Sequence, residues 1–350
     1  MSKKTKASKK RLNSLLMILL LTAVLLVMST YAWFTANRTV NIDAIDVKVA
    51  TSSGLQISAD GITWKTVLEK TDLQNAYQTY SSVVNQLPSI MAPVSSALTL
   101  DTNGRIEMFY GNVETDLDTS SDTYGEYLLT TTKQTEIASN TITDQVLQEN
   151  EYAKGYFMAF DVFLKVESVA DSDGFYMSGS VEDDSDKGLD NAARVAVVQS
   201  ASVADVDDST ATIQGISTAN GKITMWEPNA DTHTLNGVNN AAALGWATLN
   251  AGANNEPVKY AGALAAAEDV VLNKATATDS ATYFKNVTTK TSKKADTANI
   301  EMAQKLSAGI TKCRIYLWVE GQDVDCENNA SGTDLIYNLS FSLDSYAANT

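Results

Sequence analysis

The residues of this chain best suited to binding a ligand are carboxylates between positions 182 and 190. Four aspartates lie close together around a glycine there: Asp183, Asp184, Asp186 and Asp190. Calcium prefers oxygen ligands, and carboxylates grouped around a turn can supply them. The spacing does not match the twelve-residue calcium-binding loop, so a solvated acidic loop without a metal is the alternative. Calcium is therefore the one cofactor that the sequence suggests, with these aspartates as ligands.

Residues that could catalyse a reaction are few. His233 is the single histidine, and a lone histidine in a polar turn is usually structural or solvated. No Gly-x-Ser-x-Gly elbow supports a Ser-His-Asp triad, and no glycine-rich phosphate loop precedes a helix. Carboxylate-only catalysis, as in glycosidases, stays open because the acidic residues are too numerous to sort. We expect no catalytic residues, and the sequence favours a protein that is not an enzyme.

The two cysteines, Cys313 and Cys326, are the only ones in the chain. In an oxidising compartment, a disulfide between them would close a loop of about 14 residues and contribute roughly 3 kcal/mol to stability. Two free, buried thiols are the alternative. With a single histidine available, the pair cannot complete the four ligands of a structural zinc site.

The compartment, and with it the redox state, follows from the beginning of the chain. Six basic residues lie among the first eleven, and the apolar run Leu15–Met28 comes next. This order is typical of export signals, and small side chains permit cleavage between Ala32 and Trp33. A membrane helix over 12–34 is the alternative, although the apolar run of about 14 residues is shorter than the roughly 20 that span a bilayer. Either way, the remainder of the chain is predicted to be secreted or displayed at the cell surface.

The charge of the exported part excludes one class of partner. The chain has 350 residues, with 26 basic and 42 acidic side chains and a net charge of −16. The leader holds six of the basic residues and no acid, which leaves 20 basic against 42 acidic residues and a net charge of −22. Such a balance argues against nucleic-acid binding, which needs a basic surface. Simple electrostatic attachment to an anionic surface is disfavoured for the same reason.

Strands dominate the structure that the sequence predicts. Apolar and polar residues alternate with the period of a strand in several segments, which are 160–166, 175–181, 193–198, 313–319 and 335–343. Short strands with long polar connections predict a mainly β fold. We expect an antiparallel jelly-roll-like β-sandwich with insertions, preceded by an N-terminal hydrophobic helix.

The expected organisation has three parts. Residues 1–32 form the signal peptide or membrane helix, and residues 33–50 form an exposed leader or strand segment. The sandwich body covers 51–350, with insertions near 113–150 and 203–300. On its predicted strand at 313–319, the aromatic side chains of Tyr316 and Trp318 lie on the more polar face. They could form a platform for a carbohydrate, or an insertion or partner sheet could cover them.

The region around the leader resembles a known family. The apolar run is followed by the motif Thr30-Tyr-Ala-Trp-Phe-Thr35 and then by Ile45-Asp-Val-Lys-Val49. Over roughly residues 10–60 this is similar to TasA and camelysin, exported proteins of Gram-positive bacteria that a dedicated signal peptidase processes. Three downstream segments, Gly188–Val195, Trp226–Asn229 and Cys313–Cys326, resemble segments of surface proteins from anaerobic Gram-positive bacteria.

The resemblance implies a jelly-roll subunit of an extracellular fibre or biofilm matrix, with the export machinery, the signal peptidase and identical subunits as partners. In TasA-like fibres the N-terminal segment of one subunit adds a strand to the next. On this chain that segment would contain Phe34, Val40 and Ile42. Pairing within the same subunit, or a short tether, is the alternative. Camelysin is regarded as a metalloprotease, but this chain has no His-Glu-x-x-His pair, so that activity does not carry over.

A second function stays open beside the fibre subunit. If the leader is retained, the protein would be a membrane-tethered adhesin, or a surface module that binds a carbohydrate or another ligand.

Overall fold

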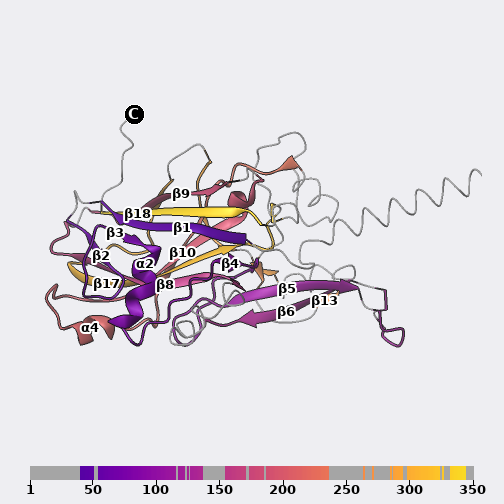
Figure 1. The fold of residues 1–350 in the computed structure, drawn as a ribbon, viewed down its shortest axis with the longest axis horizontal. Coiled ribbons are helices and arrows are strands. Elements are labelled where there is room, and N and C mark those ends of the chain that lie inside the picture. Colours follow the sequence, from indigo (N-terminus) through magenta and orange to yellow (C-terminus); the bar gives the residue numbers. More distant parts are fainter. Residues whose placement is uncertain are drawn as a thin grey trace, which may run out of the picture.

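A computed structural model gives the fold (Figure 1). It describes residues 40–50, 54–115, 117–122, 124–125, 127–136, 154–170, 173–184, 187–235, 263–264, 270–271, 284–285, 287–294, 298–323, 325–326 and 332–343. The expected N-terminal helix, the cleavage site Ala32–Trp33 and Phe34 lie outside these residues. Within them, no helix has the length and apolar character needed to cross a membrane.

Two β-sheets with a shared core form the body of the molecule. The first, sheet A, places the earliest and the last of the described strands side by side. Its order is β16 (Ala298–Glu301), β9 (Tyr176–Asp183), β18 (Asp334–Ser342), β1 (Val40–Val49), β4 (Ile90–Met91) and β7 (Lys154–Gly155), and β3 (Val67–Glu69) also pairs with β1.

Sheet B lies against sheet A, and Figure 1 shows its strands running below β18 and β1. Its order is β15 (Lys290–Thr291), β11 (Lys222–Glu227), β10 (Ala193–Val203), β17 (Gly309–Val319), β8 (Met158–Val166) and β2 (Gln56–Ser58). Smaller elements surround the two sheets. They are β5 (Met108–Thr115), β6 (Tyr127–Gln134), β12 (Ala263–Leu264), β13 (Val270–Val271), β14 (Phe284–Lys285), α2 (Lys70–Asn75), η3 (Ala76–Gln78), η4 (Leu189–Ala192) and α4 (Thr210–Gln214).

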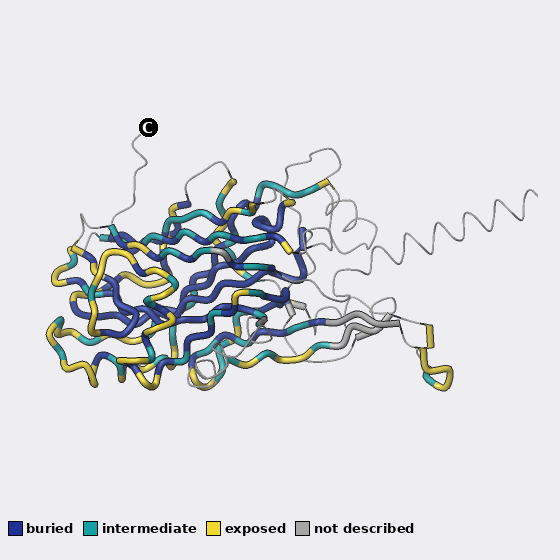
Figure 2. The backbone as a smooth tube through the Cα atoms, viewed as in Figure 1, coloured by how far each residue is buried: buried dark blue, intermediate teal, exposed yellow. Residues whose placement is uncertain are grey.

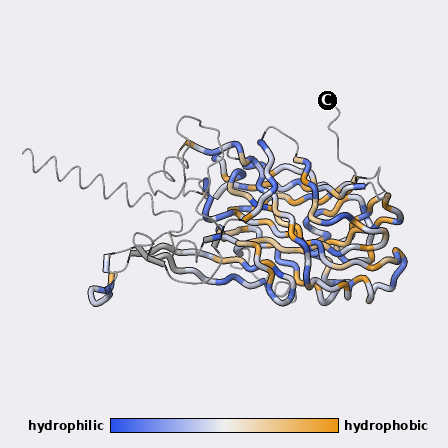
Figure 3. The backbone as a smooth tube through the Cα atoms, turned by 180° about the vertical axis from the view of Figure 1, so that it is seen from behind, coloured by the Kyte–Doolittle hydropathy of each residue, from blue (hydrophilic) through white to orange (hydrophobic). Residues whose placement is uncertain are grey.

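The core lies between the two sheets because alternate side chains of each strand point inward. Ile45 and Val47 of β1 belong to the same buried cluster as Ile315 and Leu317 of β17. Each large apolar side chain removed from water contributes about 1.5–3 kcal/mol. Figure 2 shows this buried interior, with the connection between β5 and β6 extending from it as an exposed tip. Figure 3 shows from behind that apolar residues are concentrated along the strands of the body.

The outer face of sheet B is also covered. Tyr316 and Trp318 are fully buried and belong to a second apolar cluster with Val94, Ile106 and Met108. The alternative of coverage by another part of the chain is therefore confirmed. The exposed aromatic platform is wrong, because the segment between β4 and β5 lies over it.

The mainly β fold is confirmed, with one difference in strand direction. Most of the neighbouring strands in the two sheets are antiparallel, but β1–β18, β4–β7 and β11–β15 are parallel pairs. The expected insertion at 203–300 also contains body strands, since β11 belongs to sheet B and β16 to sheet A. The described part of 113–150 includes most of the β5–β6 hairpin.

The expectation of an exposed leader over 33–50 is wrong for the residues described there. Val40 and Ile42 are 2% and 4% exposed, and β1 pairs with β18 along 41–49. The strand is apolar on its inward face, so it is stable inside a sheet and would expose that face if it extended into solvent. Pairing within the subunit, the alternative to an exposed strand, is what the structure has.

Candidate functional site

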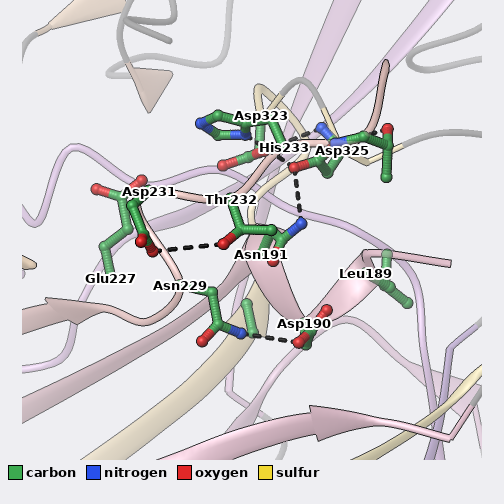
Figure 4. Close-up of polar contacts among 12 residues, drawn as sticks. Leu189, Asp190, Asn191, Glu227, Asn229, Asp231, Thr232, His233, Asp323 and Asp325 are labelled. Atoms are coloured by element: carbon green, nitrogen blue, oxygen red, sulfur yellow. Dashed lines mark hydrogen bonds and ion pairs between the residues drawn. The ribbon is translucent and has the colours of Figure 1, made fainter. Parts of the chain in front are cut away.

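Polar side chains from three connections meet at one end of sheet B (Figure 4). Strand pairing brings the connections together, because Ala193 at the start of β10 lies opposite Val319 at the end of β17. The end of β11 is adjacent, with Trp226 opposite Val195. The connections are η4 before β10, residues 228–235 after β11 and residues 320–326 after β17.

Asp325 is the centre of this cluster. Its Oδ2 lies 2.8 Å from His233 Nδ1 and accepts a hydrogen bond from Asn191 Nδ2 at 3.1 Å. Its Oδ1 accepts from the backbone N–H and the hydroxyl of Thr234, at 2.8 and 2.9 Å. Residues from all three connections therefore share one carboxylate that is fully buried.

Arg194 supplies a positive charge to the same cluster through Asp323 and Glu227. Its Nη2 donates to Asp323 Oδ2 at 2.5 Å and to Glu227 Oε1 at 2.8 Å. Its Nη1 donates to the backbone carbonyls of Asn191 and Ala193. A guanidinium that is removed from water needs such partners, because an unpaired buried charge is strongly destabilising.

The environment of His233 favours its charged form. Burial lowers the pKa of the imidazole, but the hydrogen bond to Asp325 and the negative charges of Asp323, Asp325 and Glu227 outweigh burial. The pKa of His233 is therefore raised above its ordinary value. Protonated His233 and Arg194 together balance most of the negative charge of the cluster.

His233, Asp323 and Asp325 are also the one group of three potential metal ligands that the described residues bring together, with ligand atoms within 4.8 Å of one another. The carboxylate of Asp325 already accepts from four donors, and Asp323 holds Arg194. A divalent cation would have to displace these donors and lie near a guanidinium. The geometry therefore fits a hydrogen-bonded polar cluster that holds three loops together, and it fits a metal centre less well.

The aspartates that the sequence suggested as calcium ligands are engaged separately. Asp183 Oδ2 accepts from the backbone N–H groups of Lys187 and Leu189 and so closes its own loop. Asp184 Oδ1 accepts from the backbone N–H of Asp334 at 3.1 Å. Each of these carboxylates stabilises a chain connection.

Asp190 has different hydrogen-bond partners from Asp183 and Asp184. Its Oδ2 accepts from Asn229 Nδ2 at 2.8 Å and lies 3.0 Å from Lys294 Nζ. Burial raises the pKa of this carboxyl, and Lys294 only partly offsets the effect. Asp186 lies outside the described residues. The structure thus does not gather Asp183, Asp184 and Asp190 into one ligand group.

The predicted disulfide between Cys313 and Cys326 is wrong, because both cysteines are buried thiols that are not bonded to each other. Cys313 lies in the middle of β17, opposite Gln199 of β10. Cys326 belongs to the turn after β17, where its N–H donates to Asp323 O. A strand rises about 3.3 Å per residue, so the turn begins on the order of 20 Å from Cys313, whereas a disulfide needs Cα atoms within about 7 Å.

A second polar site lies on the outer face of sheet B, at the opposite end of β17. Lys312 and Arg314 point there from β17, and Asp161 pairs with both of them, at 3.0 Å and 2.6 Å. The two cations outweigh the burial of Asp161 and lower the pKa of its carboxyl. Glu136 accepts from Arg314 Nη2 at 2.7 Å and pairs with Arg105 at 3.1 Å.

These charges form the floor of a cleft of about 380 Å³. Its walls are polar and come from three connections of the chain. The lining comprises Tyr80, Ser82, Val84, Thr102, Asn103, Arg105, Asp161, Ser217, Thr218, Ala219, Lys312 and Arg314.

Sequence reasoning missed both sites for a physical reason. His233 and Asp325 are 92 residues apart, and Arg314 and Asp161 are 153 apart. Only strand order makes them neighbours. Two local features of the sequence could have indicated these sites. Asp323 and Asp325 are closely spaced acids after a predicted strand. The cations at Lys312 and Arg314 share one face of that strand.

Comparisons with protein-family models, with curated proteins and with solved structures find no match for this chain.

Proposed function

We propose that this chain is an exported structural protein of a Gram-positive cell surface, a subunit of a fibre or matrix built on a jelly-roll-like sandwich. The TasA-like leader supports export and processing. The observation that carries the proposal is the position of β1. The first described strand after the leader pairs in parallel with β18, the last described strand.

Strand β1 has the properties of a strand that two subunits could exchange. It supplies five buried side chains, Val40, Ile42, Ile45, Val47 and Val49, and its register with β18 extends over 41–49. Identical contacts would form if the β1 of one subunit occupied the same place in its neighbour. Exchange of an identical element is a low-cost route to assembly, because it needs no new interface.

The other edge of β1 is held by short strands only. β3 pairs with it at three positions, Asp46 to Lys48, and β4 at two, Val40 and Asn41. The release of β1 would therefore break one long strand pairing and two short ones. This makes exchange slow in isolated subunits and favourable where subunits are concentrated.

A disulfide across the β1–β18 pair tests the exchange. Lys48 lies opposite Ser340, and neither side chain is in the buried core, so K48C/S340C can link the strands without disturbing the packing. Oxidation of dispersed subunits should give a bond within one chain and abolish assembly. Oxidation after assembly should give chains that are linked to one another on a non-reducing gel.

K48C alone is the matched control and should assemble normally under both conditions. Assembly of the oxidised double variant at the wild-type yield, with bonds only inside single chains, would remove β1 exchange from the proposal. Failure of the reduced wild-type protein to form fibres at any concentration tested by electron microscopy would remove the fibre function itself.

The second candidate function is a membrane-tethered adhesin or a surface module that binds a ligand. The polar cleft above Lys312 and Arg314 is the observation that favours it. The two functions differ in the state of the leader, because a tethered protein must keep its basic N-terminal residues.

A further inference from the structure

We infer that the cleft at Arg105 and Lys312 binds a single carboxylate carried by a hydroxyl-rich ligand, an acidic saccharide unit of the uronate type. The inference does not rest on the fibre proposal, since it concerns the outer face of sheet B and not the β1–β18 pair.

The charged side chains at the floor of the cleft favour an anionic ligand. Arg105, Lys312 and Arg314 are paired with two carboxylates, Asp161 and Glu136. Three cations against two anions leave the cluster with a net charge of +1. The exported chain is strongly acidic as a whole, but charges beyond about 8–10 Å are largely screened at physiological ionic strength. The carboxylate of Asp101, which accepts from the backbone N–H groups of Asn103 and Arg105, reduces this excess, so the cleft suits a ligand with no more than one negative charge.

The three cations differ in how many of their N–H donors the protein already uses. Arg314 is committed, because it donates to Asp161, to both oxygens of Glu136 and to the carbonyl of Val84. Lys312 contacts the Tyr80 hydroxyl and Asp161, which accounts for two of its three N–H donors. Among the contacts of the described residues, Arg105 uses only Nε, on Glu136.

Arg105 also lies where an incoming ligand would meet it. Its side chain is 35% exposed, whereas those of Lys312 and Arg314 are only 6% and 3% exposed. The planar fork of an arginine suits a carboxylate, with two parallel hydrogen bonds. Arg105 would therefore hold the carboxylate at the rim, and Lys312 would add a point charge from below.

The wall of the cleft carries hydroxyl and amide groups, and its surface is more polar than apolar. Exposed Ser82, Thr102, Asn103 and Ser217 line it. Such groups donate to and accept from the hydroxyls of a sugar. A volume of about 380 Å³ lies at the lower end of the range for small-molecule sites, which suits one saccharide unit better than a long chain.

The wall is closely fitted where two connections meet. Gly104 has a φ of +75°, and a Cβ there would lie 1.9 Å from Thr218 O. The Thr218 hydroxyl donates to Asn103 O at 2.7 Å. Only glycine fits between the two connections, and the contact holds Asn103 and Arg105 at a fixed distance from Ser217.

Titration calorimetry of the purified full chain tests the inference with four probes. D-glucuronate carries the carboxylate and the hydroxyls, D-glucose lacks the charge, and inorganic phosphate lacks the sugar. N-acetylaspartate amide presents the carboxylate of a protein side chain. We expect glucuronate to bind at least about tenfold more tightly than each of the others, with a dissociation constant on the order of 1 mM.

R105Q removes the guanidinium of a partly exposed side chain, and we expect it to weaken glucuronate binding at least about tenfold. K290Q, on the exposed strand β15, is the matched loss of one cation and should bind glucuronate like the wild type. A circular dichroism spectrum of each variant checks that the fold is intact.

Four results would overturn the inference. Equal binding of glucose or of N-acetylaspartate amide would remove the acidic saccharide as the ligand, and equal binding of phosphate would leave only a general anion site. An equal loss in K290Q would place the effect in overall charge. Absence of binding by all four probes at about 50 mM would remove the site.

Discussion

At the scale of single residues, the buried charges of this protein fall into two kinds. Arg194 and Asp161 have partners of opposite charge. Glu320 is fully buried, and its hydrogen-bond donors among the described residues are neutral, including Trp318 Nε1 at 3.2 Å and the backbone N–H of Gln322 at 3.2 Å. Burial therefore raises the pKa of Glu320 to about 7, and the hydrogen bond from Ser95 and the charge of Arg194 offset the effect only in part.

The raised pKa of Glu320 makes stability depend on pH in a defined direction. The folded protein holds the proton more tightly than the unfolded chain, so the stabilisation is complete below the ordinary glutamate pKa. It is lost as the pH rises through about 7. The shift corresponds to a loss on the order of 3 kcal/mol between about pH 4.5 and pH 8.

We predict that E320Q removes this loss, because a glutamine keeps the shape and an acceptor oxygen but cannot ionise. Urea unfolding should find the variant close to the wild type at pH 4.5 and more stable by on the order of 3 kcal/mol at pH 8. E301Q, at an exposed position of β16, should follow the wild type at both values. If the free energy of unfolding of E320Q and of the wild type changed equally between the two pH values, the raised pKa of Glu320 would be contradicted.

At the scale of elements, the polar cluster around Asp325 fastens loops from three strands of sheet B. Its strength should depend on the charge of His233, whose pKa is raised because its acidic neighbours outweigh burial. A raised folded pKa means that the stabilisation is complete below the ordinary histidine pKa and is lost as the pH rises through the folded value. The cluster around Asp325 therefore stabilises the folded protein most in mildly acidic solution.

We predict that H233N costs about 1.5–3 kcal/mol at pH 5.5, the usual value of a hydrogen bond to a charged group. The cost should shrink toward about 1 kcal/mol, the value of a neutral hydrogen bond, as the pH rises through the raised pKa of the imidazole. The comparison is made in the E320Q background, so that Glu320 does not titrate over the same range. His233 is the only histidine, so no other imidazole contributes to the pH dependence. If the stability cost of H233N stayed constant with pH, the charged hydrogen bond to Asp325 would be contradicted.

The strands are the features of the fold that the sequence predicted best. Alternation of apolar and polar residues over 160–166 and 313–319 correctly predicted β8 and β17, because the two-residue period of a strand can be read from the order of its residues. Alternation left two alternatives open for the outer face of β17, an exposed aromatic platform or coverage by another part of the chain, and the structure has both faces buried. That outcome depends on the segment from Val94 to Met108, which covers the strand from a distant part of the chain.

At the scale of the whole molecule, the acidic body and the basic leader have opposite charges. We predict that the mature protein begins at Trp33, because the small side chain of Ala32 suits a signal peptidase. Mass spectrometry of the native N-terminus checks this. A start at Trp33 fits a secreted subunit, whereas an intact lysine-rich end would contradict cleavage and favour the tethered module. An A32R variant should retain its leader, because a large cation blocks such a site.

The sequence by itself determined the class of secondary structure and the strands with the cleanest alternation, since these depend on neighbours along the chain. Only the tertiary structure decided which side chains meet. It put Val40 and Ile42 in the core, separated Cys313 from Cys326, and joined His233 to Asp325. The reason is that strand order and register set distances between remote residues, and neither is encoded in local spacing.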